Sequence, residues 1–285
     1  MIAYVDTATG RFAYLQRGAE AGRPVLCLHG FPDHPRSFVP LMDALAEAGY
    51  RVVAPWMRGY APSVLDGPYD ADQLGADAGA LADALFGRQP CALIGHDWGA
   101  VAAYSALQAR PDQWRVAVTM AVPHPLAFLH ALRTQPAQLR RSWYMGFFQL
   151  PLVPELVMPR QNFALVQRLW RTWSPGYQRS AAAHAELAAC LAASMPAPIG
   201  YYRAMLRPVG AAVQRLRDGD GRRITVPTLH LQGARDGCIA PAACAGQERF
   251  FAGPFRSEVV ADAGHFLQLE APAAIAARVR DWIDL

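Results

Sequence analysis

Short runs of apolar residues recur along the chain, and each of them ends at Gly, Pro or Asp. The runs are VLCLHG, RVVAP, CALIGH, VAVTMAVP, TLHLQG and SEVVAD, which begin at residues 25, 51, 91, 116, 228 and 257. Short runs that are apolar throughout, rather than alternating, are typical of parallel strands buried on both faces of a sheet. The pattern therefore predicts a buried strand at each of these positions.

Amphipathic segments with helical spacing separate these runs. The clearest are FVPLMDALAEAG, DQLGADAGALADALFG and APAAIAARVRDWIDL, which begin at residues 38, 72 and 271. The first two end on Gly49 and Gly87, as helices commonly do, and Pro272 suits the first turn of the third. Strands that alternate with helices predict an α/β fold with a doubly wound, mostly parallel sheet.

The alternation stops between residues 125 and 222, where the sequence is rich in Pro, Trp and Arg and its pattern is helical. Examples are NFALVQRLWRTW and AELAACLAASM, and the strand pattern resumes only at ITVPTLHLQG. We therefore predict a core formed by residues 1–124 and 223–285, with a helical lid, residues 125–222, inserted between two core strands. Because ligands bind at the carboxyl ends of strands in such sheets, an insertion there would cover the site.

The sequence GHDWG, residues 95–99, follows a predicted strand and precedes a predicted helix. It has the form of the sharp nucleophile turn G-x-S-x-G, with Asp97 in place of the serine. A carboxylate at this position is ionised at neutral pH, and it can attack an electrophilic sp³ carbon to form an ester. We therefore predict that Asp97 is a nucleophile; the alternative is that it only caps the helix.

Three further segments supply the remaining parts of such a site in the order expected for this turn. His265 follows the last predicted strand and would activate water, and Asp236 follows the preceding strand and would orient the histidine. Asp262 is a rival for the acid role, but Asp236 is preferred because it follows a strand end. The backbone amides of Phe31 and Trp98 are the predicted oxyanion-hole donors.

Composition removes several other classes of function. The 27 basic residues are all Arg, which excludes a Schiff-base lysine and a P-loop lysine, and no basic block suggests a nucleic-acid partner. No apolar stretch is long enough for a membrane span, and no secretory signal is visible. The five scattered cysteines indicate reduced thiols rather than disulfides or a zinc site, so a cytoplasmic location is expected.

Taken together, these motifs resemble the α/β-hydrolase fold and, within it, the lidded epoxide hydrolases. The resemblance covers nearly the whole chain and rests on HGFPD, MRGYAPS, GHDWGA, VPHP, the lid segments and GHFLQLEAP. It implies two lid tyrosines that protonate the epoxide oxygen: Tyr144 in WYMGFFQLP and Tyr202 in YYRAM, with Tyr201 as a neighbouring alternative. An alkoxide leaving group needs such a donor, whereas a halide does not.

The resulting prediction is a cofactor-independent and metal-independent hydrolase that converts an apolar epoxide to a vicinal diol. Trp98, Phe31 and Phe148 are expected to contact the substrate, and a second copy of the chain is kept as a candidate partner. Two rivals remain. A haloalkane dehalogenase would share the Asp nucleophile, although Phe31 stands where such enzymes often have Asn. A non-catalytic ligand-binding protein on the same fold is disfavoured by the intact set of nucleophile, acid and base.

Overall fold

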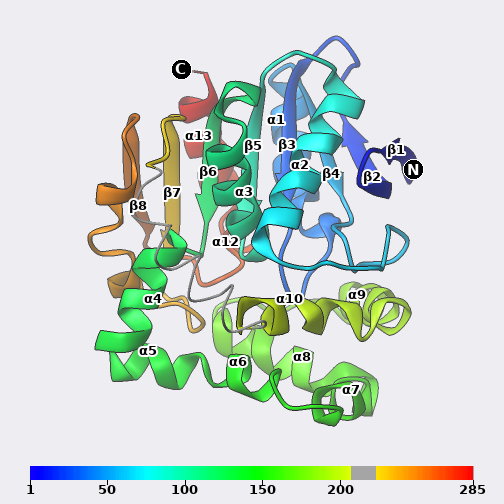
Figure 1. Ribbon diagram of the computed structural model, residues 1–285, viewed down its shortest axis with the longest axis vertical. Helices are drawn as coiled ribbons and strands as arrows, with labels where there is room; N and C mark the ends of the chain where they lie inside the picture. The colour runs from blue at the N-terminus through cyan, green and yellow to red at the C-terminus, as the bar shows by residue number, and fades with distance from the viewer. Residues whose placement is uncertain (207–222, 285) are drawn as a thin grey trace.

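A single mixed sheet forms the centre of the molecule in the computed structural model, which describes residues 1–206 and 223–284 (Figure 1). Within these residues the sheet has eight strands in the order β1-β2-β4-β3-β5-β6-β7-β8. The pairs β1–β2 and β2–β4 are antiparallel, and the remaining pairs are parallel. The predicted mostly parallel sheet is therefore confirmed.

The six apolar runs form strands where they were predicted. They are β3 (Arg23–Leu28), β4 (Tyr50–Pro55), β5 (Cys91–His96), β6 (Trp114–Met120), β7 (Thr228–Gly233) and β8 (Phe255–Val260). Strands β5 and β7 are buried along their whole length. Strand β8 is not: it is the sheet edge, and most of its residues are partly or fully exposed. The expectation of burial on both faces was wrong there because an edge strand lacks one neighbour.

Two strands near the N-terminus were not predicted. Strands β1 (Ala3–Thr7) and β2 (Gly10–Arg17) form a hairpin in which Thr7 pairs with Gly10. Strand β2 buries Phe12, Ala13 and Leu15 and carries the hairpin onto β4. Its apolar and polar residues are too mixed to resemble the fully apolar runs of the interior strands, because only part of its surface is covered.

Helices cover both faces of the sheet. Helices α2 (Ala71–Phe86) and α3 (Trp98–Ala109) pack together on one face, whereas α1 (Val39–Glu47), α12 (Leu267–Glu270) and α13 (Pro272–Ile283) pack together on the other (Figure 1). The predicted helix ends are confirmed: Gly49 and Gly87 have φ of +85° and +65°, which glycine adopts readily, and Pro272 lies in the first turn of α13.

The segment between β6 and β7 forms helices at one end of the sheet (Figure 1). These inserted helices are α4 (Pro125–Thr134), α5 (Pro136–Arg141), α6 (Trp143–Phe147), α7 (Val153–Val157), α8 (Arg160–Trp173), α9 (Ala181–Ser194) and α10 (Ala197–Leu206). Residues 207–222, which the sequence analysis assigns to the lid, lie outside the described residues.

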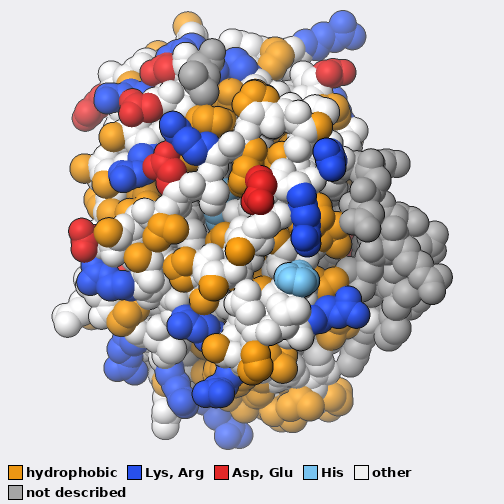
Figure 2. Space-filling model, turned by 90° about the vertical axis from the view of Figure 1, so that its left-hand side faces the viewer, with side chains coloured by type: hydrophobic (Ala, Val, Ile, Leu, Met, Phe, Trp, Pro, Cys, Tyr) orange, Lys and Arg blue, Asp and Glu red, His pale blue; other side chains and the backbone are white. Residues whose placement is uncertain are grey.

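The structure shows the state of the five cysteines and the distribution of Arg side chains on one face of the molecule. All five cysteines are free. On the face shown in Figure 2, Arg side chains are spread out rather than gathered in one basic patch. Among the helices of the described residues, none is long and apolar enough to cross a membrane.

Candidate active site

A strained turn places Asp97 between β5 and α3. Asp97 has φ 53° and ψ −118°, a positive-φ conformation that is unusual for a residue with a side chain. The neighbouring glycines make the turn compact: a Cβ at Gly95 would collide with the backbone of Gly99, and one at Gly99 would collide with the carbonyl of Leu28. The Asp97 N–H donates to the carbonyl oxygen of Met120 at 3.1 Å, which ties the turn to the end of β6.

The Asp97 carboxylate bonds to the loop after β3 rather than to the helix that follows it. It makes no capping hydrogen bond to α3, so the interpretation of Asp97 as a simple helix cap fails. Instead, its Oδ1 accepts a 2.7 Å hydrogen bond from the Phe31 backbone N–H, and its side chain is buried. Gly30 is required here, because a Cβ at that position would collide with Oδ1. Among the described residues, Trp98 N–H makes no hydrogen bond to this carboxylate in the resting geometry.

His265 lies between two carboxylates. Its Nδ1 is 2.9 Å from Oδ2 of Asp236, and its Nε2 is 3.5 Å from Oδ2 of Asp97. His265 and Asp236 side chains are fully buried. The backbone oxygen of His265 accepts a 2.8 Å hydrogen bond from the His96 ring, which steadies the histidine loop beside the turn. The nucleophile, histidine and acid positions expected from the sequence are thus brought together.

The Asp236 carboxylate accepts hydrogen bonds from its own loop and from the end of β7. Its Oδ1 accepts hydrogen bonds from the backbone N–H groups of Cys238 (2.7 Å) and Ile239 (2.9 Å), and its Oδ2 accepts one from Gln232 (2.9 Å). The rival Asp262 lies elsewhere: its side chain is 92% exposed and faces Arg235. The structure therefore brings Asp236, and not Asp262, to the histidine.

The charges around His265 favour its protonated form. Burial by itself lowers the pKa of the imidazole, but the carboxylates of Asp236 and Asp97 outweigh it and raise the pKa to about 10. In the resting protein, the ring is therefore an imidazolium at neutral pH, held between the side chains of Asp236 and Asp97. Loss of charge on either carboxylate would lower the pKa of His265 again.

This shift predicts a pH-dependent contribution to stability. Because the pKa of His265 is raised from about 6.5 to about 10 on folding, its contribution is full below pH 6.5 and is lost as the pH rises to 10. We expect the free energy of unfolding of the wild-type protein, relative to that of a His265→Gln variant, to fall steadily between these values. Urea unfolding of both proteins from pH 6 to 10 measures this difference, and a difference that is constant with pH would contradict the assignment.

Tyr202, on α10, reaches the turn from the inserted helices. Its hydroxyl is buried and makes no hydrogen bond of good geometry with a described residue, although the nearby Trp98 side chain interacts with it and acts to lower its pKa. Its ring makes edge contacts with Phe31 (centroids 5.2 Å apart) and Trp98 (5.2 Å) and lies 4.9 Å from Phe148. The neighbouring alternative, Tyr201, uses its hydroxyl to donate to the carbonyl of Arg58. Tyr202 therefore presents a free phenol to the site, whereas Tyr201 does not.

Tyr144, on α6, lies beside Tyr202, with ring centroids 5.7 Å apart. Its hydroxyl is 3.2 Å from the Sγ of Cys238. Burial is the main cause that raises the pKa of both phenols well above 10, and the charge of Asp97 acts in the same direction. Both hydroxyls therefore keep their protons at neutral pH and can act as hydrogen-bond donors.

Three residues at this site were missed by sequence reasoning. Gln138 of α5 donates to the Cys238 carbonyl in the acid loop, the segment 234–240 that follows β7 and carries Asp236. The Cys238 thiol contacts Tyr144. The carbonyl of Trp173 accepts hydrogen bonds from the backbone N–H groups of Gly237 (3.0 Å) and His265 (3.1 Å). Nothing in the local sequence distinguishes Gln138 or Trp173 from other helix residues. Cys238 carries a weak signal only through its position two residues after Asp236.

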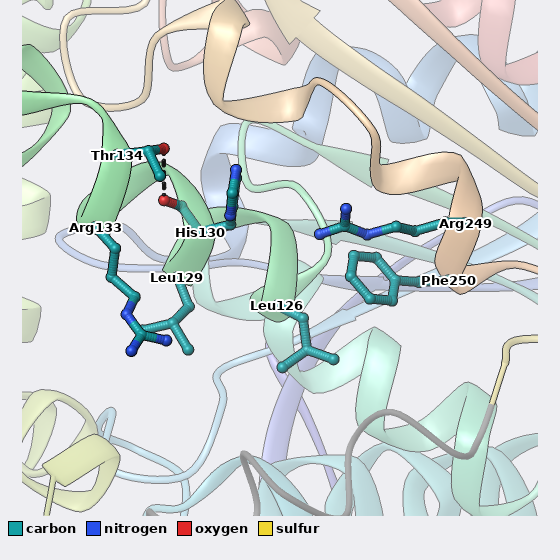
Figure 3. A pocket seen from close by; sticks show the side chains of 7 residues that line it. All are labelled: Leu126, Leu129, His130, Arg133, Thr134, Arg249 and Phe250. Carbon is teal, nitrogen blue, oxygen red and sulfur yellow. Dashed lines mark hydrogen bonds between the residues drawn. The ribbon is translucent and has the colours of Figure 1, made fainter.

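Donor atoms of Asp236, Cys238 and His265 lie within 4.8 Å of one another, a grouping that can suit a metal ion. In this protein, however, the Asp236 carboxylate is bound by His265 Nδ1 and by the Cys238 backbone N–H, and the Cys238 thiol contacts the Tyr144 hydroxyl. A separate surface pocket of about 340 Å³, lined by none of these three residues, lies between α4 and the 3₁₀ turn Gln247–Phe250 (Figure 3). It is lined by Leu126, Leu129, His130, Arg133, Thr134, Arg249 and Phe250, and contains no nucleophile–base pair.

Proteins that resemble this chain in sequence or in structure point to one family. Residues 25–278 match the model of the alpha/beta hydrolase family. Epoxide hydrolase 3 of Xenopus tropicalis is 30% identical, covering 96% of this chain and 74% of its own length, and human epoxide hydrolase 4 is 30% identical over 92% and 72%. The crystal structure of epoxide hydrolase A from Mycobacterium thermoresistibile has a TM-score of 0.84 at 25% identity and covers 100% of this chain and 98% of its own.

Proposed function

Since the chain belongs to the alpha/beta hydrolase family and is an epoxide hydrolase within it, we propose that it uses Asp97 as the nucleophile on an apolar epoxide. The observation that carries this proposal is the position of the Asp97 carboxylate, held by the Phe31 amide and flanked by His265 and Tyr202. The product is a vicinal diol, formed in two steps through an ester. The inserted helices act as the lid.

In the first step, an oxygen of Asp97 attacks one epoxide carbon and the carbon–oxygen bond of the ring breaks. The hydrogen bond from Phe31 orients the carboxylate and leaves Oδ2 free of such a bond to attack. The departing oxygen takes a proton from a lid phenol. The imidazolium of His265 can supply a replacement proton, so the step ends with an alcohol, an ester and a neutral histidine.

In the second step, His265 acts as a base. Ester formation removes the negative charge of Asp97, which is one of the two charges that raise the pKa of the histidine. The neutral ring then takes a proton from a water molecule, which attacks the ester carbonyl, while Asp236 stabilises the imidazolium that forms. The Phe31 amide holds the developing oxyanion, and we assign the second donor position to the Trp98 amide. The acyl carbon–oxygen bond to the product then breaks, the departing alkoxide takes the proton of the added hydroxyl group, and the diol leaves Asp97 as a carboxylate.

The aromatic surroundings support an apolar substrate. Phe31, Phe148 and Trp98 surround the Tyr202 ring and are buried. Such a wall favours substrates whose remaining surface is hydrophobic, because desolvating a polar group there would cost free energy. A panel of styrene, fatty-acid and terpene epoxides, compared by kcat/KM, identifies the substrate class. Hydrolysis confined to small polar epoxides would contradict this part of the proposal.

The lid tyrosines give a testable contrast. We expect Tyr202→Phe to slow ring opening about 10²-fold and Tyr144→Phe about tenfold, because among the described residues the Tyr144 hydroxyl already contacts Cys238 whereas the Tyr202 hydroxyl makes no hydrogen bond of good geometry. The double variant should lose about 10³-fold or more. Single-turnover kinetics measure the opening rate. Tyr201→Phe is the matched control on the same helix and should retain wild-type opening, since its hydroxyl binds the Arg58 carbonyl.

Haloalkane dehalogenation is the alternative that shares the same nucleophile. Two phenols that keep their protons beside Asp97 favour a leaving oxygen over a halide, because a halide leaves without protonation. Chloride release from a chloroalkane, measured beside the epoxide panel, separates the two reactions. Chloride release faster than diol formation would favour the dehalogenase.

A further inference from the structure

Cys238 is buried on the acid loop, and its thiol is 3.2 Å from the hydroxyl of Tyr144. We propose that Cys238 is a positioning residue that holds the phenol of Tyr144 in place for ring opening, an inference that rests on the proposed function. It makes the acid loop serve two parts of the reaction: Asp236 orients the histidine, and Cys238 orients a lid acid.

The acid loop and the inserted helices are joined closely enough to support this role. Gln138 of α5 is buried, donates to the Cys238 carbonyl at 2.9 Å and accepts from the Ala240 N–H at 2.9 Å. Arg141, at the end of the same helix, donates to the Asp236 carbonyl at 2.6 Å. Helix α6, which carries Tyr144, follows directly. The backbone of Cys238 is therefore fixed relative to the tyrosine that its side chain contacts.

The contact makes the two lid phenols unequal. The Tyr144 hydroxyl has a thiol partner, whereas the Tyr202 hydroxyl is buried without one among the described residues. A thiol is only a weak hydrogen-bonding group. It can therefore hold the Tyr144 ring in one orientation and still release the hydroxyl when the alkoxide that develops on the opening ring needs a proton.

The surroundings also keep Cys238 from competing with Asp97 as a nucleophile. Burial, followed by the charges of Asp236 and Asp97, raises the pKa of the Cys238 thiol well above 9. The thiolate is the reactive form of cysteine, so a neutral thiol at this position is a hydrogen-bonding group rather than an attacking one.

The test uses the full-length protein and measures ring opening and ester hydrolysis separately in single-turnover experiments with an epoxide that the wild type hydrolyses. Cys238→Val, which has a similar apolar volume but cannot bind the phenol, should slow ring opening about fivefold and leave ester hydrolysis within about twofold. Cys238→Ser, which restores a hydrogen-bonding group, should bring opening back to within about twofold of wild type. Cys190→Ala, a thiol at a different contact between the inserted helices and the core, should not change either rate.

A double-mutant cycle with Tyr144→Phe distinguishes positioning from general packing. If Cys238 acts through Tyr144, adding Cys238→Val to Tyr144→Phe should slow opening no further. Additive losses, equal slowing of both steps, or no effect of Cys238→Val on opening would each overturn the inference. If Cys238→Val does not fold by thermal melting, Cys238→Ala replaces it in the same cycle. Failure of the proposed function would look different: Tyr144→Phe would leave opening unchanged, or no ester would form on Asp97.

Discussion

Replacement of Asp97 by alanine should reduce epoxide turnover by about 10⁴-fold or more, without loss of the fold. The reason is chemical: in the proposed mechanism Asp97 supplies the atom that bonds to carbon. Among the described residues beside His265, the Asp236 carboxylate is held by hydrogen bonds from Gln232, Cys238 and Ile239, and Cys238 remains a protonated thiol, so neither replaces it. The backbone conformation at residue 97, with φ of 53°, is held by the close approach of Gly95 and Gly99, so the turn should persist in the variant. Steady-state kinetics and circular dichroism of the purified variant measure both properties.

An isotope experiment tests the same step in the wild-type protein. If Asp97 attacks the epoxide as proposed, the added oxygen in a single turnover with fresh enzyme in H₂¹⁸O comes from its carboxylate, so the first diol released should contain almost no ¹⁸O. After many turnovers the carboxylate will have exchanged its oxygens, and the label should then appear in the product. Heavy diol in the first turnover would mean that water attacks the epoxide directly, and the assignment of Asp97 as nucleophile would be wrong.

Replacement of His265 by glutamine should separate the two steps. In the proposed mechanism Asp97 can still open the ring, although more slowly, because the imidazolium that replenishes the proton is gone. Ester hydrolysis should fall by about 10⁴-fold, since the base that activates water is absent. The ester should therefore accumulate. Intact-protein mass spectrometry after substrate addition should show one adduct with the mass of the epoxide.

The matched control for this variant is Asp262→Asn, three residues before the histidine. Its carboxylate is exposed and pairs with Arg235, so the variant should turn over epoxide at the wild-type rate and show no adduct. Asp236→Asn should resemble His265→Gln, because it removes the partner of Nδ1. Full turnover by His265→Gln, with no adduct at any time, would exclude His265 as the base.

Several features of the fold could be predicted because they arise from local chemistry. The interior strands are buried on both faces, so their sequences are apolar throughout, and glycines with positive φ end α1 and α2. Strands β1 and β2 escaped prediction because they lie at or near the sheet edge and mix apolar with polar residues. Strand β8 was predicted, but its exposure was not, since neighbours in a sheet come from distant parts of the chain.

The sequence alone determined the chemical groups of the candidate site. Asp97 stands in a recognisable turn between strand and helix, and Asp236 and His265 follow strand ends, which meet at one edge of a parallel sheet. Tertiary structure decided the rest. It separated Asp236 from Asp262 and Tyr202 from Tyr201, in each case by showing which side chain is already bound or exposed elsewhere.

Only the folded chain could reveal Cys238 and Gln138, because their contacts join residues about 100 positions apart in sequence. The charge state of His265 has the same origin. It depends on burial and on two carboxylates from different loops, and electrostatic interactions of this strength exist only at short distances in a buried environment. The sequence by itself thus determined which chemical groups are present and which strand ends they follow. The packing of the folded chain decided which of these groups contact one another, which have no partner and which carry a proton.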